Sequence, residues 1–162
     1  MVAEAVYQAV KSGNPDAQVL VGGFINPTHA ESFVRNMLQS YSGYYDIVNF
    51  HVYETEEDNT SATRQLKSWM AELGVQKPMW ITETATLFAS GAETDALNKI
   101  GRSVARRHAR SFAGGVERIF WFTFVGSPQP EDGVSVPNPD KIVGLGWAAK
   151  GTTEFHPRPA YQ

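Results

Sequence analysis

The sequence predicts an α/β fold in which four parallel β-strands alternate with helices. Segments with helical periodicity and short apolar runs alternate along the first 125 residues. The connections between the apolar runs are long enough to hold one helix each, as right-handed crossovers between parallel strands require. A hydrophobic content of 42% and a charged content of 19% are ordinary for a folded domain, and 162 residues suffice for one sizeable core.

Four helices are expected where apolar residues recur at spacings of three and four. They cover residues 3–12, about 28–38, about 60–73 and about 94–112. Thr28 and Glu31 have the spacing of a capping box for the second helix. The fourth helix carries a basic stripe, made of Lys99, Arg102, Arg106 and Arg110. We interpret that stripe as a solvated face, because the chain as a whole is acidic.

Four strands are expected in the runs QVLVGGF, YYDIVNFHVY, PMWITET and VERIFWFTF, which are rich in β-branched and aromatic residues. They begin at residues 18, 44, 78 and 116. The segment from 126 to 147 holds four prolines and no periodicity, so it is expected to be a long loop. We therefore interpret 1–162 as a single domain, with α–β repeats in 1–125 and a long loop and tail in 126–162.

Composition and charge exclude several classes of partner. The formal charge of −3 gives no electrostatic basis for binding nucleic acid or an anionic membrane. No apolar run approaches the roughly 20 residues of a membrane helix, and the N-terminal residues lack the pattern of a signal peptide, which predicts a cytoplasmic protein. The chain has no cysteine, and its four histidines lack paired ligand spacing, so no metal or cofactor is expected.

Several segments, in order, resemble the second half of a glycoside hydrolase. They are PDAQVLVGGF, YDIVNFHVYE, KPMWITETAT, VERIFWFTF, G-L-G-W and P-R-P-A-Y. The similarity is to the clan A type of retaining (β/α)8 glycosidases, and families 39 and 5 are the nearest in the pattern of these sequence motifs. The resemblance implies that the four strands are strands five to eight of a TIM barrel. A full barrel needs about 250 residues, so the length also favours half a barrel, a (βα)4 unit.

Glu83 is the strongest candidate for a catalytic residue. It follows the apolar run of the third strand directly, and a carboxylate at the carboxyl end of a barrel strand lies on the face where the active-site loops gather. The residues alone leave open a helix-capping or loop carboxylate. The resemblance implies the nucleophile position. The acid/base glutamate that the clan carries at the end of strand four has no counterpart in the chain, because strands one to four are absent.

Three aromatic or imidazole side chains are candidates for lining a sugar site. His51 and Tyr53 alternate onto one face at the exit of the second strand. The resemblance implies that they border the sugar and hydrogen-bond the nucleophile; the alternative is a core pair with satisfied polar ends. Trp121 on the fourth strand resembles the aromatic floor beneath the cleaved sugar, although packing in the core is an equal alternative.

Two further residues are candidates for contact with substrate. Asn26 follows the first strand and is placed to reach a ligand hydroxyl, or to start a helix beside Pro27. Glu54 begins an acidic run that continues through Glu56, Glu57 and Asp58 and is expected to be a solvated loop. Within the chain, Glu54 is the nearest source of a substitute acid.

An open four-stranded parallel sheet leaves two edges and one face that need covering. Two copies related by a twofold axis would supply eight strands, so we predict a homodimer that acts on a carbohydrate. Such a dimer would set two copies of Glu83 across one mouth, at a separation that favours inversion over retention. The alternative is a non-catalytic fragment or a sugar-binding scaffold that associates with itself or with a complementary half.

Overall fold

The structure is a computed structural model that describes residues 2–85 and 96–123, together with 125–126, 146–147, 154 and 156–157. Its helices are α1 (Val2–Gly13), α2 (Glu31–Ser40), α3 (Glu56–Glu72) and α4 (Ala96–Ala113), and 3₁₀ helices η1 and η2 span Pro27–Ala30 and Ser42–Tyr44. The main strands are β1 (Phe24–Ile25), β2 (Val48–Val52), β3 (Met79–Thr84) and β4 (Val116–Trp121). They confirm the predicted α/β fold.

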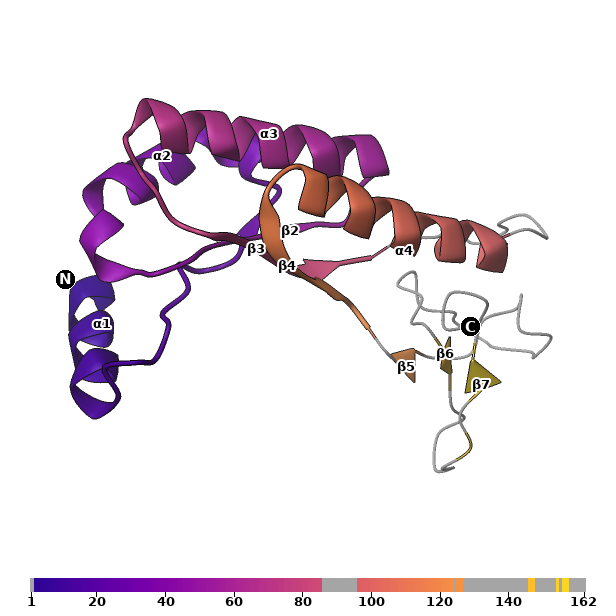
Figure 1. The fold of residues 1–162 in the computed structure, drawn as a ribbon, viewed down its shortest axis with the longest axis horizontal. Helices are drawn as coiled ribbons and strands as arrows, with labels where there is room; N and C mark the ends of the chain where they lie inside the picture. Colours follow the sequence, from indigo (N-terminus) through magenta and orange to yellow (C-terminus); the bar gives the residue numbers. More distant parts are fainter. Residues whose placement is uncertain are drawn as a thin grey trace.

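The four main strands form one sheet in the order β1-β2-β3-β4, and every neighbouring pair is parallel. Helices α2, α3 and α4 lie side by side along one side of this sheet (Figure 1). The first strand is shorter than expected, because Leu20 makes only an isolated bridge to Ile47 and regular pairing resumes at Phe24. The intervening Gly22-Gly23 offers no side chains to pack on either face, which weakens a strand.

The hydrophobic core lies between the sheet and the helices. Alternate residues of β2 (Val48, Phe50 and Val52) are fully buried and pack with Val34 and Leu38 of α2 and with Leu66 of α3. The next residues along β2 point to the opposite face. That opposite face carries the polar side chains of the site described below, together with exposed aromatic rings such as Phe120, which is 46% exposed.

The third helix begins four residues earlier than the sequence predicted. Thr55 Oγ1 accepts a hydrogen bond from the amide of Asp58, and Asp58 Oδ2 accepts one from the amide of Thr55, which is a capping box. The prediction of an acidic loop was therefore wrong for Glu56, Glu57 and Asp58. These three form the first turn of α3, where negative charge is favourable beside the free amides of the helix start.

The capping box expected at Thr28 is absent from α2. Its N-cap residue is Ala30, which makes no side-chain capping bond. Asn26 instead caps the short helix η1, and its side chain accepts from the amide of Thr28. Within the predicted basic stripe, Arg106 and Arg110 lie on an exposed side of α4, close to Glu56 and Glu57 of α3. The side chain of Lys99 lies outside the described residues.

Three two-residue strands occur where the sequence predicted a long loop and tail. β5 (Val125–Gly126) pairs in parallel with β6 (Gly146–Trp147), which pairs antiparallel with β7 (His156–Pro157). The proposed division of the chain at residue 125 stays a prediction. Among the helices of the described residues, none has the length and apolar character needed to cross a membrane.

Asp46 connects α1 with the segment before the sheet through hydrogen bonds and an ion pair. Its carboxylate accepts hydrogen bonds from the Val19 amide (2.8 Å) and the Tyr7 hydroxyl (3.1 Å), and Lys11 Nζ lies 2.9 Å from Oδ2. Burial acts to raise the pKa of Asp46, but these hydrogen bonds outweigh it, so the pKa is lowered from 3.8. The ionised carboxylate is therefore the form that the folded state favours.

We expect this cluster to lose its stabilising effect in acid. A carboxyl whose pKa is lower in the folded state contributes stability above its unfolded pKa of about 3.9, and the contribution disappears as the pH falls through the folded pKa. Urea unfolding between pH 7 and pH 2.5 should show Asp46→Asn less stable than the wild type at pH 7 and the difference shrinking below pH 4. A constant difference over this range would contradict the role given to Asp46.

Candidate active site

Glu83 lies near the carboxyl end of β3, where a bulge changes the register of the sheet. Phe50 of β2 pairs with Ile81, whereas His51 pairs with Glu83, so Thr82 is the extra residue. A bulge of this kind redirects side chains and is common beside active sites. Ile81 is buried against the helices, while the Glu83 side chain is 37% exposed. The bulge therefore brings both Thr82 and Glu83 to the side of His51.

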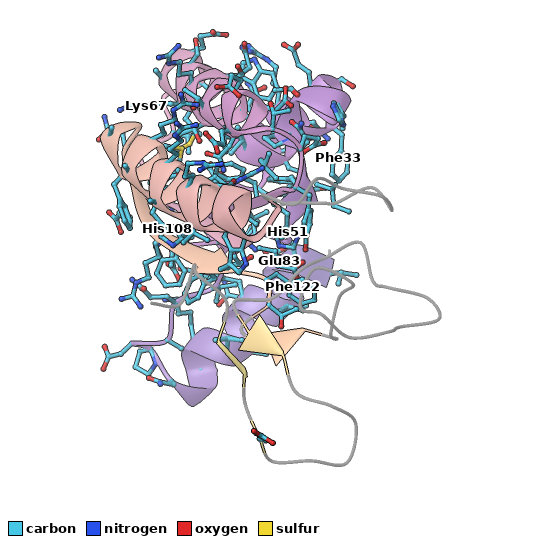
Figure 2. The ribbon with its side chains drawn as sticks, turned by 90° about the vertical axis from the view of Figure 1, so that its right-hand side faces the viewer. Phe33, His51, Lys67, Glu83, His108 and Phe122 are labelled. Atoms are coloured by element: carbon cyan, nitrogen blue, oxygen red, sulfur yellow. The ribbon has the colours of Figure 1, made fainter. Side chains whose placement is uncertain are left out.

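The Tyr53 hydroxyl donates a hydrogen bond to Glu83 Oε2, and this is the central contact of the site. Burial, and after it the hydrogen bond to the carboxylate, raise the pKa of Tyr53 well above its ordinary value of 10.0. His51 Nδ1 lies 3.8 Å from the same oxygen. Figure 2 shows His51, Glu83 and Phe122 in one region of the molecule, away from Lys67 on the helical layer. The structure thus brings together His51, Tyr53 and Glu83, as the sequence suggested.

A chain of hydrogen bonds fixes the ring of His51 at its Nε2 edge. Thr82 Oγ1 donates to Asn49 Oδ1 at 2.6 Å, and His51 Nε2 lies 2.9 Å from the same Thr82 oxygen. Because the hydroxyl has a single hydrogen, which goes to Asn49, Nε2–H is the donor to Thr82. His51 therefore turns its Nδ1 edge towards Glu83. Sequence reasoning missed Asn49 and Thr82; the alternation of Asn49 with His51 and Tyr53 along one strand was the available signal.

Gly23 makes room for the His51 ring. A Cβ atom at this position would lie 2.5 Å from Nε2 and 2.7 Å from Cε1 of His51. Such distances are shorter than any van der Waals contact, so even a methyl group would displace the imidazole. A glycine is required at position 23 because the His51 ring lies so close to its backbone.

Gly23→Ala is expected to move the His51 ring and to destabilise the fold by about 1–3 kcal/mol, the usual cost of overpacking. The measurement is the His51 Cε1–H signal in a ¹H–¹³C spectrum, together with urea unfolding. Gly22→Ala is the matched control, since its Cβ would meet nothing within 4 Å. Equal spectra for the two variants would contradict the close packing of His51 on Gly23.

Trp121 and Phe122 point to opposite sides of β4. Trp121 is in register with Thr84, whose hydroxyl contacts Arg107 of α4, so both residues face the helices. The Phe122 ring packs edge-on against Tyr53, with the ring centres 6.5 Å apart. Phe122, directly after β4, is thus an aromatic ring beside Tyr53, and the sequence reasoning passed over it in favour of its neighbour. A role for Trp121 in substrate binding stays a prediction.

Asn26 and Glu54 both contact the backbone around the site. Asn26 is 3% exposed. Its backbone N–H donates to the backbone carbonyl of His51, and its side-chain Oδ1 accepts from the hydroxyl of Thr28 at 2.7 Å. Glu54 Oε2 accepts from the amide of Tyr53 at 3.1 Å, and Oε1 lies 4.0 Å from His29. Asn26 thus starts a helix, which was one of its two predicted roles. Direct contact of either residue with substrate stays a prediction.

The His51 and Glu83 side chains are both partly exposed, at 17% and 37%. Among the described residues, one cavity of about 830 Å³ borders His29 and Arg35, and another of about 420 Å³ borders Lys67 and Val75. Neither is lined by Glu83, His51 or Tyr53. In the described residues, no group of three or more His, Asp or Glu side chains has the arrangement of a metal site. The arrangement offers one oriented carboxylate, with a tyrosine hydroxyl and an imidazole beside it.

A family model described as the catalytic core of glycosyl hydrolases matches residues 5–138, a range that includes the four main strands and Glu83. The chain belongs to this family. The glycosyl hydrolase core confirms the broader part of the predicted resemblance, whereas membership of family 39 or family 5 stays a prediction. No curated protein sequence matches the chain.

Two solved structures resemble the fold of this glycosyl hydrolase core. A glucosidase from Croceicoccus marinus superposes with a TM-score of 0.59 at 13% identity, over 74% of this chain and 27% of its own. A GH39 β-xylosidase from Caulobacter crescentus gives a TM-score of 0.61 at 15% identity, over 89% of this chain and 32% of its own. The chain therefore spans between a quarter and a third of the length of these two proteins and matches part of the TIM barrel of such glycosidases.

Proposed function

We propose that Glu83 is the nucleophilic carboxylate of a site for O-glycosyl hydrolysis. The observation that carries the proposal is the hydrogen bond from Tyr53 to Glu83 at the carboxyl edge of β3, in a chain that belongs to a glycosyl hydrolase core family. A retaining glycosidase needs one carboxylate to attack the anomeric carbon and a second carboxyl group, about 5–5.5 Å away, to protonate the leaving oxygen. Glu83 supplies the first of these groups.

The neighbours of Glu83 suit a nucleophile. The hydrogen bond from Tyr53 fixes the direction of Oε2, and the high pKa of Tyr53 keeps the phenol protonated as a donor at neutral pH. His51 Nδ1 lies 3.8 Å from the same oxygen, and Thr82 and Gly23 hold the imidazole ring in place. Phe122 presents an exposed ring next to Tyr53, and aromatic rings of this kind stack on the apolar faces of sugars.

The test is hydrolysis of aryl β-glucosides and aryl β-xylosides, chosen because the two structural relatives are named as a glucosidase and a β-xylosidase. Release of the phenol should be seen for the chain alone or for the chain mixed with a polypeptide that carries strands one to four of such a barrel. In the mixed sample, the anomeric configuration of the first product, read by ¹H NMR, should be retained, because strands one to four supply the second carboxyl group at the retaining distance. Inversion of the anomeric configuration in the mixed sample would make Glu83 a general base and not a nucleophile. The absence of phenol release in both samples would contradict the proposal.

We further propose that the sheet is completed by a second copy of the chain. Edge strands β1 and β4 are both free to pair within the described part of the chain. Exposed apolar side chains follow these edges, including Ile25 (70% exposed) and Phe122 (41%). A twofold axis would set β4 of each copy beside β1 of the other and close eight strands. Light scattering at micromolar concentration should give twice the mass of one chain; a stable monomer would contradict the dimer.

A non-catalytic role is the second candidate, and the coverage of the relatives favours it. The chain spans 27% and 32% of the two structural relatives, and the resemblance implies that the second carboxylate of a glycosidase stands on strand four, which has no counterpart in this sequence. In this case the chain binds sugar without cleaving it, or acts only with a complementary half. Activity that appears only in the mixture described above would mean that Glu83 acts only within a complemented barrel and that the chain by itself is not catalytic. Binding of a sugar, measured by calorimetry, without release of phenol would identify a binding module.

A further inference from the structure

Arg107 is a charged residue in the interior of the protein, on the side of α4 that faces the sheet. It is 1% exposed, and Ser103 and Ser111 on the same side of the helix are buried with it. Charged side chains are rarely buried to this extent unless their hydrogen bonds are satisfied. Sequence reasoning assigned the arginines of α4 to a solvated stripe and passed over this one.

The guanidinium of Arg107 joins the exits of two strands. Nη1 donates to the carbonyl of Val52 (3.3 Å) and to Oγ1 of Thr84 (3.0 Å), and Nη2 donates to the carbonyl of Glu54. Val52 and Glu54 are the residues on either side of Tyr53. Thr84 follows Glu83 directly, and its hydroxyl also donates to the carbonyl of Val52 at 2.7 Å. One side chain therefore holds the backbone on both sides of Tyr53 and the residue next to Glu83.

The chemistry of this contact suits positioning better than packing. The acceptors are two carbonyls and two hydroxyls, since Nε also donates to Oγ of Ser103 on the same helix at 3.2 Å, so among the described residues no carboxylate offsets the burial by direct pairing. An apolar side chain of similar volume packs a helix on a sheet at a lower desolvation cost. The planar guanidinium, in contrast, offers several donors in a fixed geometry, which can bond several acceptors at set positions. Burial lowers the pKa of Arg107, and the acidic first turn of α3 opposes this change.

We propose that Arg107 is a positioning residue that holds the Tyr53 hydroxyl against Glu83 by fixing the ends of β2 and β3. The proposal rests on the assignment of Glu83 above as the nucleophile, but it concerns the geometry of the pair and is testable without substrate. If Arg107 only stabilised the fold, its loss would lower stability and leave the Tyr53–Glu83 pair as it is.

The experiment is ¹³C NMR of the full chain with tyrosine labelled at Cζ. Of the six tyrosine signals, that of Tyr53 is assigned with Tyr53→Phe, and Glu83→Ala gives its position when the pair is broken. Arg107→Met keeps the apolar stem and removes the guanidinium. We expect the Tyr53 signal of Arg107→Met to move at least half of the way to its position in Glu83→Ala, and Tyr53 to ionise at lower pH than in the wild type.

Ser111→Ala is the matched control. Ser111 is buried one turn further along α4, where its hydroxyl donates to Asn59 of α3 at 2.9 Å, so its loss weakens helix packing away from the site. It should lower the urea midpoint and leave the Tyr53 signal in place. If Arg107→Met fails to fold, Arg107→Lys decides the question, because one ammonium cannot replace all four hydrogen bonds and should move the signal in the same direction by less.

An unmoved Tyr53 signal in a folded Arg107 variant would overturn the positioning role, whatever the loss of stability. This failure is distinguishable from failure of the proposed function. An inactive wild-type chain whose Tyr53 signal responds to Arg107→Met still supports the positioning role. An active chain whose signal does not respond overturns the positioning role alone.

Discussion

Glu83→Gln is expected to reduce the rate of aryl glycoside hydrolysis by about 10⁴-fold or more, the scale seen when a covalent nucleophile is removed. The amide is nearly isosteric with the carboxylate and still accepts the hydrogen bond from Tyr53, so the fold should be preserved. It carries no negative charge, and it is a much poorer nucleophile towards the anomeric carbon. The effect should therefore fall on the turnover rate with little change in substrate binding. Initial rates over a range of substrate concentrations measure both quantities.

The control for this prediction is Glu72→Gln at the carboxyl end of α3. Glu72 is an exposed carboxylate that pairs with Arg35 on the helical layer, and it has no contact with the site residues among the bonds described for it. Its replacement should leave the hydrolysis rate within about twofold, because exposed ion pairs contribute only about 0–1 kcal/mol. Hydrolysis by Glu83→Gln at the rate of the wild type would show that Glu83 is not the nucleophile.

Phe50→Ala is expected to destabilise the protein by about 3–5 kcal/mol, the range for truncating a buried aromatic side chain. Phe50 is fully buried on the central strand β2, between Phe24 on β1 and Ile81 on β3, and it faces the helices. Truncation removes the transfer free energy of the ring and leaves a cavity that the sheet cannot close. The melting temperature should fall by about 6–20 °C for a chain of this size.

Phe112→Ala provides the comparison for Phe50→Ala. Phe112 lies near the end of α4 and is 52% exposed, and its ring contacts His108 on the same helix. The change in its free energy of unfolding should stay near 0.5 kcal/mol, as for most surface substitutions. Thermal and urea unfolding of the two variants, followed by circular dichroism, measure the difference. Similar losses for both would mean that the sheet–helix interface is not the main core of the protein.

The elements of the fold could be predicted because their signals are local. The run PMWITET is apolar and β-branched, and it forms β3 over Met79–Thr84. The periodic segment expected over about 94–112 forms α4 over Ala96–Ala113. Boundaries were less certain where two local signals competed. Thr28 and Thr55 both have an acidic residue three positions on, and only Thr55 forms the capping box, because Asn26 and Pro27 start a 3₁₀ helix before the first of them.

The candidate site was predictable in its main residue and less so in its supporting ones. Glu83, His51 and Tyr53 were found because they stand at strand exits, where parallel strands gather side chains. Phe122 was missed because the register of β4 with β3 decides which aromatic residue faces the site, and that register contains bulges. Arg107 was missed because it is adjacent to an exposed arginine, and only the packing of α4 on the sheet shows which of the two turns inward.

The sequence by itself therefore determined the order of the elements, the parallel sheet and the carboxylate at the end of β3, since periodicity and strand composition depend on neighbouring residues alone. The tertiary structure decided the bulge that brings Thr82 and Glu83 to one face, the close contact of Gly23 with His51, and the contacts of Arg107 with the ends of β2 and β3. Each of these depends on distances between segments 20 to 60 residues apart in the chain. Such distances are set by how the strands register and how the helices pack, which no local pattern encodes.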